Sequence, residues 1–270
     1  MKSDHADIFA KKGILRFASQ GRVRYGLWEK GRIRVYEGSP FSGGSPGAAS
    51  LKLDEVRLLA PCRPSKVVAV GLNYKAHALE MKKPLPREPM IFLKPSSAVI
   101  GPGETILRPA DMTQRLDHES ELAIVIGRPV SEASPDEAGA AILGYTCLND
   151  VTARDLQAQD IQYTRAKGFD TFCPLGPIIA LDLDVSALSV RCLVNGEIRQ
   201  ESNTSDLIFP VADLVSFISR VMTLKAGDVI ATGTPAGVGP MYDGDVVSVE
   251  MEGIGRLNNP VRDRGQAGAR

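Results

Sequence analysis

Residues 116–127 read Leu-Asp-His-Glu-Ser-Glu-Leu-Ala-Ile-Val-Ile-Gly, with two glutamates placed just before a run of β-branched residues. The run predicts a β-strand, because β-branched side chains favour extended backbone. Side chains alternate along a strand, so Glu119 and Glu121 are expected on one face, about 6.5 Å apart along the backbone. Ala123 and Val125 continue that face and indicate that it enters the protein. The strand therefore predicts two like charges at the edge of a core.

Two buried carboxylates are costly unless a cation neutralises them. Oxygen ligands suit Mg²⁺, Mn²⁺ or Ca²⁺, so the pair predicts a divalent metal site. A solvated strand end with two exposed glutamates is the alternative. Asp150 lies near the end of a second apolar strand, residues 142–151, and is either the N-cap of a helix near Thr152 or a third oxygen ligand. Asn149 competes with it for the cap position, which leaves the carboxylate of Asp150 available to a metal.

Composition indicates an ordinary globular protein. The chain has 270 residues, of which 43% are hydrophobic, enough for one large domain or two unequal ones. Lys plus Arg and Asp plus Glu number 32 each, which argues against a nucleic-acid partner recognised by bulk charge. We expect no membrane span and no signal peptide, and hence a cytoplasmic protein. The four cysteines are widely spaced, so a structural zinc site is not expected.

The first part of the chain predicts a small β-rich domain. Residues 14–36 form three short apolar segments separated by Gln-Gly and Lys-Gly, a pattern typical of a β-meander. Residues 38–47 are rich in Gly, Ser and Pro and predict a linker or long loop. We therefore expect an N-terminal domain over residues 1–58 that packs or dimerises, and a catalytic domain over residues 59–270.

A strand over residues 66–71 leads into a predicted helix, with Asn73 as its N-cap. His77 and Glu80 are three residues apart and therefore share one helical face. The carboxylate can orient the imidazole and raise its basicity, as a general base for water activation requires. A surface ion pair is the alternative interpretation.

Later segments give one more candidate residue and four structural predictions. Residues 167–177 are too rich in Gly and Pro to predict regular structure, and Lys167 is either a solvated loop charge or a buried functional cation. Asn195-Gly196 predicts a hairpin turn, and residues 210–224 an amphipathic helix. Residues 232–239 form a glycine-rich loop that can present N–H groups to an anion but lacks the ending of a P-loop.

Taken together, these motifs resemble the fumarylacetoacetate hydrolase family, in its bacterial branch with a small extra N-terminal domain. The resemblance spans roughly residues 60–260. It rests on Gly71–Tyr74 with His77 and Glu80, Asp117–Leu122, Asn149–Asp150, Lys167–Asp170 and Thr232–Pro235. It implies an α+β, β-rich fold, the family's mixed β-sandwich roll.

The resemblance also implies site residues and partners. Glu119, Glu121 and Asp150 would be the ligands of Mg²⁺ or Mn²⁺, with Ca²⁺ as a substitute in a crystal. The substrate would be a small 2-keto acid, and the protein a homodimer. The residues implied to face the substrate are Tyr74, Arg154, Gln157, Lys167 and Thr234.

The expected reaction is the hydrolysis of a C–C bond in an acylpyruvate, which releases pyruvate and a carboxylic acid. His77, supported by Glu80, would deprotonate the attacking water, and Lys167 would stabilise the enolate of pyruvate. Isomerisation of a 2-hydroxymuconate-type or 2-hydroxyheptadienedioate-type diacid and decarboxylation of oxaloacetate pass through the same enolate and stay open. A non-catalytic ligand-binding β domain is the alternative from another class, and a metalloprotease is disfavoured because His-Glu-x-x-His is absent.

Overall fold

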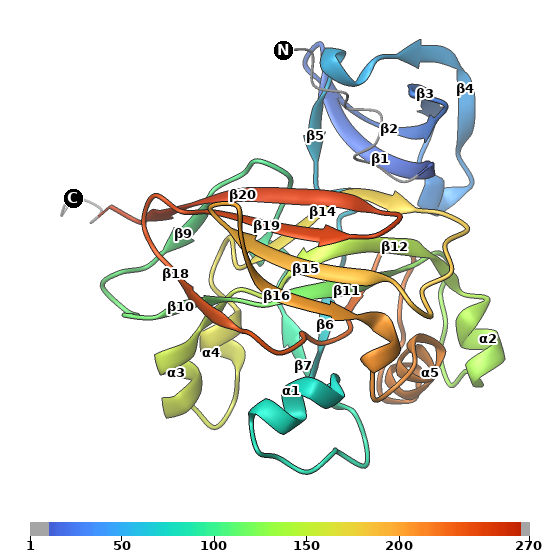
Figure 1. Cartoon of the computed structure of the whole chain (residues 1–270). Helices are drawn as coiled ribbons and strands as arrows, with labels where there is room; N and C mark the ends of the chain where they lie inside the picture. Colours follow the sequence, from blue (N-terminus) through green and yellow to red (C-terminus); the bar gives the residue numbers. More distant parts are fainter. Residues whose placement is uncertain (1–10, 266–270) are drawn as a thin grey trace.

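The computed structural model describes residues 11–265, and it confirms the β-rich roll expected from the sequence (Figure 1). A twelve-stranded mixed sheet forms the centre of the molecule. Its strands are β1 (Lys12–Ser19), β2 (Arg22–Glu29), β3 (Arg32–Glu37), β4 (Ser45–Leu51), β5 (Arg57–Leu59), β6 (Val67–Gly71), β7 (Met90–Lys94), β8 (Val99–Ile100), β11 (Ser120–Ile126), β12 (Ile142–Asn149), β14 (Cys173–Ala180) and β17 (Val229–Ala231).

Two smaller sheets and five α-helices complete the fold over residues 11–265. The five-stranded sheet contains β9 (Ile106–Arg108), β15 (Ser189–Val194), β16 (Glu197–Asn203), β19 (Val246–Met251) and β20 (Gly255–Asp263). The three-stranded sheet contains β10 (Leu116–His118), β13 (Thr152–Ala153) and β18 (Gly239–Met241). The α-helices are α1 (Lys75–Glu80), α2 (Pro135–Gly139), α3 (Arg154–Gln159), α4 (Thr164–Lys167) and α5 (Val211–Val221).

The central strands of the large sheet are covered on both faces, so this part of the molecule has three layers. Buried side chains of β11, β12 and β14 pack against β15, β19 and β20, as at the contact of Leu122 with the cluster that contains Val249. On the opposite face, Leu214 and Ile218 of α5 pack on Ile124 of β11. The central strand β11 is therefore buried on both sides, as its run of β-branched residues predicts.

The N-terminal meander is confirmed, and its sheet is continuous with the large sheet. β1 pairs antiparallel with β14 through Gly13 and Ile14. The linker or long loop predicted over residues 38–47 is shorter than expected, because Pro40–Ser42 is a 3-10 helix and β4 already begins at Ser45, where it pairs with β3. β4 lies at the edge of the sheet, where Pro46 and Gly47 are tolerated because one side of the strand needs no ladder hydrogen bonds. The division at residue 58 stays a prediction.

Three further local predictions are corrected. The segment 167–177 is not irregular throughout, since α4 ends at Lys167 and β14 begins at Cys173. Asn73 is not a helix cap: its side chain bonds the backbone of Phe209 and Thr232, and α1 begins after Tyr74. The predicted strand through both glutamates is interrupted, because β10 ends at His118 and β11 begins at Ser120.

Two other local predictions are confirmed. Asn195 and Gly196 form the turn between β15 and β16, and both have positive φ, as such a tight hairpin requires. The amphipathic helix is α5, which follows Pro210. Within residues 11–265, no helix has the length and apolar character needed to span a bilayer.

Candidate active site

An acidic cluster forms where the chain passes from the three-stranded sheet to the twelve-stranded sheet. Glu119 occupies the break between β10 and β11, Glu121 lies on β11, and Asp150 directly follows the neighbouring strand β12. The backbone N–H of Asp150 donates to Glu119 O at 2.9 Å. One carboxylate oxygen from each residue lies within 4.8 Å of the others, and all three side chains are buried. Asp150 is not the N-cap of a helix, since α3 begins only at Arg154.

Three cations surround this cluster. Lys167, at the end of α4, donates to Glu119 at 2.9 Å and to Asp150 at 2.6 Å. Lys94, at the end of β7, donates to Asp150 from the other side at 2.5 Å. Arg154 pairs with Glu119, and its Nε donates to Asp117 at 2.9 Å. Lys167 is therefore a buried, paired cation and not a solvated loop charge.

The cations act unequally on the carboxylates. Burial alone would raise the pKa of Glu119, but Lys167 and Arg154 outweigh burial and hold that pKa at about 2. Burial also raises the pKa of Glu121, and the charges of Asp150 and Glu119 raise it further. The Gly233 N–H donates to Glu121 at 2.8 Å and offsets this only in part. One carboxylate of the cluster is thus left without a cation of its own.

This donor set fits a divalent cation. The three side chains offer hard oxygen ligands at close range, which suits Mg²⁺ or Mn²⁺. Burial and the charges of Asp150 and Glu119 raise the pKa of Glu121, and a bound cation would offset the repulsion among the three carboxylates. We therefore assign the acidic cluster as a candidate metal centre.

A cavity of about 120 Å³ opens beside the acidic cluster. It brings together most of the residues that the sequence singled out, from segments far apart in the chain. The polar residues in its wall are His77, Lys83, Glu119, Glu121, Asp150, Arg154, Gln157, Tyr163, Lys167 and Thr234. Met81, Met90 and Phe92 are among its apolar residues.

His77 and Glu80 form a pair at the edge of this cavity. Nδ1 of His77 lies 2.8 Å from Glu80 Oε2, and the other carboxylate oxygen of Glu80 accepts the Gly237 N–H at 3.1 Å. The His77 side chain is only 14% exposed, and Glu80, at 45%, stands behind it toward solvent. The glycine-rich loop does present N–H groups to anions, and those anions are Glu121 and Glu80 of the same chain.

Tyr74 does not line the cavity, although the resemblance placed it near the substrate. Its side chain is fully buried, and its hydroxyl has no hydrogen-bond partner among the described residues. Burial, followed by the charge of Glu121, raises the pKa of this hydroxyl. Tyr74 therefore packs beneath the site.

Sequence reasoning missed Lys94 and Gln200. Lys94 ends an otherwise apolar strand. A charged residue in such a strand could have indicated a buried, paired lysine. Gln200 is buried on β16, and its amide donates to Thr234 Oγ1 and to Pro235 O, both at 2.8 Å. Its amide oxygen accepts the Ser120 N–H at 3.0 Å. Nothing in the local sequence around Gln200 marks this role.

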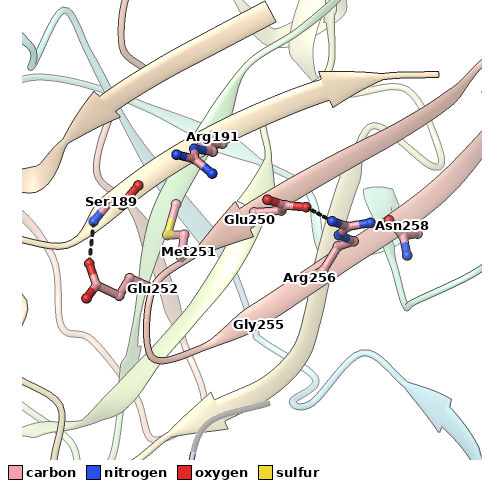
Figure 2. Close-up of a pocket in the computed structure, with 8 residues that line it drawn as sticks. All are labelled: Ser189, Arg191, Glu250, Met251, Glu252, Gly255, Arg256 and Asn258. Atoms are coloured by element: carbon pink, nitrogen blue, oxygen red, sulfur yellow. Dashed lines mark hydrogen bonds and ion pairs between the residues drawn. The ribbon is translucent and has the colours of Figure 1, made fainter. Parts of the chain in front are cut away.

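A broader groove of about 640 Å³ lies on β15, β19 and β20 (Figure 2). Its charges are already matched, since Arg256 pairs with Glu250 and the Ser189 N–H donates to Glu252 at 3.2 Å. It shares no residue with the cavity beside the acidic cluster. We assign no reaction to this groove.

Fold and site together define a β-rich protein with a buried acidic cluster, suited to a divalent metal, beside a His–Glu pair. Residues 66–262 match the family model described as fumarylacetoacetate (FAA) hydrolase C-terminal, and residues 14–61 match the Rv2993c-like N-terminal model. The chain belongs to the FAA hydrolase family.

Similar proteins carry out different reactions. A structure of 2-hydroxyhepta-2,4-diene-1,7-dioate isomerase from Mycobacterium marinum is 46% identical, with a TM-score of 0.88 over 94% of this chain and 100% of that one. A fumarylacetoacetate hydrolase from Exiguobacterium antarcticum is 42% identical, with a TM-score of 0.85 and coverage of 94% and 100%. An oxaloacetate tautomerase of Bacillus subtilis is 40% identical over 80% of this chain and 76% of its own length.

Proposed function

We propose that this protein is a divalent-metal-dependent hydrolase that cleaves an acylpyruvate, a 2,4-diketo acid, into pyruvate and a carboxylic acid. The observation that carries the proposal is the His77–Glu80 pair, 2.8 Å apart, in which His77 lines the same cavity as the acidic cluster. Hydrolysis of a C–C bond needs a base for water next to groups that stabilise an enolate. A non-catalytic ligand-binding domain would need neither.

The hydrogen bond to Glu80 sets the tautomer of His77. A carboxylate only accepts hydrogen bonds, so Nδ1 carries the proton and Nε2 keeps its lone pair. Nε2 is then the atom that takes a proton from water. Glu80 stabilises the imidazolium that results, and the Gly237 N–H holds Glu80 in place.

The atoms of the reaction balance as follows. Water loses a proton to His77 Nε2, and its oxygen bonds to the distal carbonyl carbon of the substrate. The bond between that carbon and C3 then breaks, and its electron pair becomes the enolate of pyruvate. The imidazolium returns the proton to C3, which yields pyruvate, and the carboxylic acid formed at the distal carbon releases the second proton of the water to solvent.

Other residues of the cavity hold the substrate and its developing charge. Lys167 and Thr234 both line the cavity. In the proposed reaction the Lys167 ammonium stabilises the enolate oxygen. When bound by Glu119, Glu121 and Asp150, Mg²⁺ or Mn²⁺ would supply Lewis acidity toward the 2-keto acid. The ring of Phe92 lies 5.1 Å from Lys167 Nζ and shields that ammonium from water.

Keto–enol tautomerisation of oxaloacetate is a second candidate, favoured by the oxaloacetate tautomerase among the similar proteins. His77 would then take a proton from C3 of the substrate and return it to oxygen, with no water consumed. Isomerisation of an unsaturated hydroxydiacid would use the same base, in line with the isomerase that resembles this chain.

The test is turnover of acetylpyruvate, fumarylpyruvate, oxaloacetate and 2-hydroxyhepta-2,4-dienedioate, with Mg²⁺, with Mn²⁺ and with EDTA. Substrate absorbance and pyruvate release are followed together. Metal-dependent pyruvate release from the acylpyruvates supports the hydrolase. Absorbance change without pyruvate, seen only with oxaloacetate or the dienedioate, would replace it with the tautomerase or the isomerase.

A further inference from the structure

Lys83 lies in the exposed segment after α1 and contributes to the wall of the active-site cavity. Its backbone N–H donates to Ala78 O at 3.0 Å, and the N–H of Met81 donates to His77 O at 3.0 Å. These bonds tie the segment to α1, the helix that carries the His77–Glu80 pair. The position of Lys83 at the cavity is therefore linked to that of the base.

Lys83 is the cation of the cavity wall that has no carboxylate partner. Lys167 and Arg154, the other two cations in the wall, are both paired with Glu119. Within residues 11–265, the Lys83 ammonium makes no ion pair or side-chain hydrogen bond. Its charge is therefore available to a ligand.

The charges of the cavity wall point to a substrate with two negative charges. Three carboxylates and three cations line the cavity, so their formal charges cancel. A divalent ion in the acidic cluster leaves an excess of two positive charges, which a dianion would match. A 2-keto acid with one carboxylate would match only one of them.

The apolar part of the wall suits the carbon chain of such a substrate. Met81 and Met90 contribute thioether side chains, and Phe92 contributes an aromatic face. Flexible, polarizable methionine side chains can adapt to an unsaturated carbon chain. An aromatic ring offers the same chain an apolar surface, whereas charged side chains would not favour it.

We propose that Lys83 is a specificity-determining residue that binds the distal carboxylate of a diacid substrate. The substrate class is then a 2,4-diketo acid whose acyl group carries a second carboxylate. The inference rests on the proposed function for the identity of the pyruvate half. The inference adds a second carboxylate, at the end of the substrate opposite the pyruvate half.

The first test compares fumarylpyruvate with acetylpyruvate, using the Mg²⁺-loaded wild type, Lys83→Met and Lys83→Arg. Lys83→Met lowers kcat/KM for fumarylpyruvate about tenfold, mainly through KM, because a charge-assisted hydrogen bond at a partly exposed site is lost. Its kcat/KM for acetylpyruvate is unchanged, and Lys83→Arg keeps the preference for the diacid. The matched control is Lys82→Met, next in the chain but outside the cavity wall, which changes neither value.

The second test measures binding without turnover. Calorimetry compares 2-oxoglutarate, a 2-keto diacid, with 2-oxopentanoate, the monoacid of equal chain length. Lys83→Met raises the Kd of the diacid about tenfold and leaves the Kd of the monoacid unchanged. Equal effects of Lys83→Met on diacid and monoacid, or no effect on either, overturn the proposal for Lys83. Absence of acylpyruvate turnover in the wild type overturns the hydrolase, while the binding comparison still tests Lys83.

Discussion

Lys94 Nζ lies 2.5 Å from Asp150 Oδ1, and both side chains are shielded from solvent. The same ammonium donates to Val151 O at 3.3 Å, so it is anchored to the chain that carries the carboxylate. Asp150 is thus held between Lys94 and Lys167, on two sides. This fixes the direction of a candidate metal ligand before any metal binds.

Removing Lys94 therefore affects the metal-free protein most. Lys94→Met leaves a buried carboxylate without one of its two cations, which lowers the free energy of unfolding in EDTA by about 3 to 5 kcal/mol. Mg²⁺ recovers part of that loss, because it neutralises Asp150. Chemical denaturation with and without Mg²⁺ measures both values.

A matched control is Lys66→Met, which removes the partner of buried Asp228 away from the metal centre. Its loss of stability is the same with and without Mg²⁺. If Lys94→Met also lost the same stability with and without Mg²⁺, the assignment of Asp150 as a metal ligand would be contradicted.

The role of Glu80 is separable from metal binding. Glu80→Gln removes the carboxylate that orients His77, and we expect kcat for an acylpyruvate to fall about 100-fold, a typical contribution of general base catalysis. The Kd for Mn²⁺ stays at the wild-type value, since Glu80 is not part of the acidic cluster. Glu88→Gln, an exposed change in the segment after α1, is the control and keeps full activity. Retention of full activity by Glu80→Gln would remove Glu80 from the mechanism.

Gln200 and Thr234 are expected to act as one unit. Gln200 Nε2 donates to Thr234 Oγ1 at 2.8 Å, so the Thr234 hydroxyl proton is free to face the cavity. Gln200→Met and Thr234→Val each lower kcat/KM about tenfold, and the double variant loses little more than either one. Thermal unfolding checks that each variant is folded. Additive losses in the double variant would show that the two residues act independently.

Asp228 gives the fold a pH dependence of known sign. Burial alone would raise the pKa of Asp228, but hydrogen bonds from Lys66, Ser65 and the Lys225 N–H outweigh burial and lower it. A folded-state pKa below the unfolded value, about 3.9, contributes stability above that pH, and the contribution is lost as pH falls through the folded pKa. At pH 7 we expect Asp228→Asn to lower the free energy of unfolding by about 3 kcal/mol.

The difference in free energy of unfolding between the wild type and Asp228→Asn therefore becomes smaller below about pH 4. Urea denaturation from pH 7 to pH 3 measures it, with Asp213→Asn on the exposed face of α5 as the control. A difference that is constant over this range would contradict the lowered pKa of Asp228.

Local patterns predicted the elements that depend on neighbours in sequence. The alternation around Glu121, the spacing of His77 and Glu80, and the Asn-Gly turn at residue 195 all report on contacts within a few residues. The family resemblance then brought Asp150 and Lys167 to the same site. What could not be predicted depends on partners far along the chain.

Asn73 illustrates this limit. It has the residue type of a helix cap, but its side chain bonds Phe209 and Thr232, more than a hundred positions away. Similarly, the strand breaks at Glu119 because β10 and β11 belong to different sheets. The local alternation of side chains gives no information about sheet membership. The domain division at residue 58, the homodimer and the cytoplasmic location stay predictions.

The most direct test of the central claim is the fate of solvent oxygen during turnover. Fumarylpyruvate is incubated with the Mg²⁺-loaded protein in H₂¹⁸O, and the released acid is analysed by mass spectrometry, with His77→Asn and EDTA as controls. Hydrolysis with His77 as the base predicts one solvent oxygen in each fumarate released by the wild type, and almost no fumarate from either control. Absence of fumarate and pyruvate from the metal-loaded wild type, or undiminished release by His77→Asn, would contradict the account.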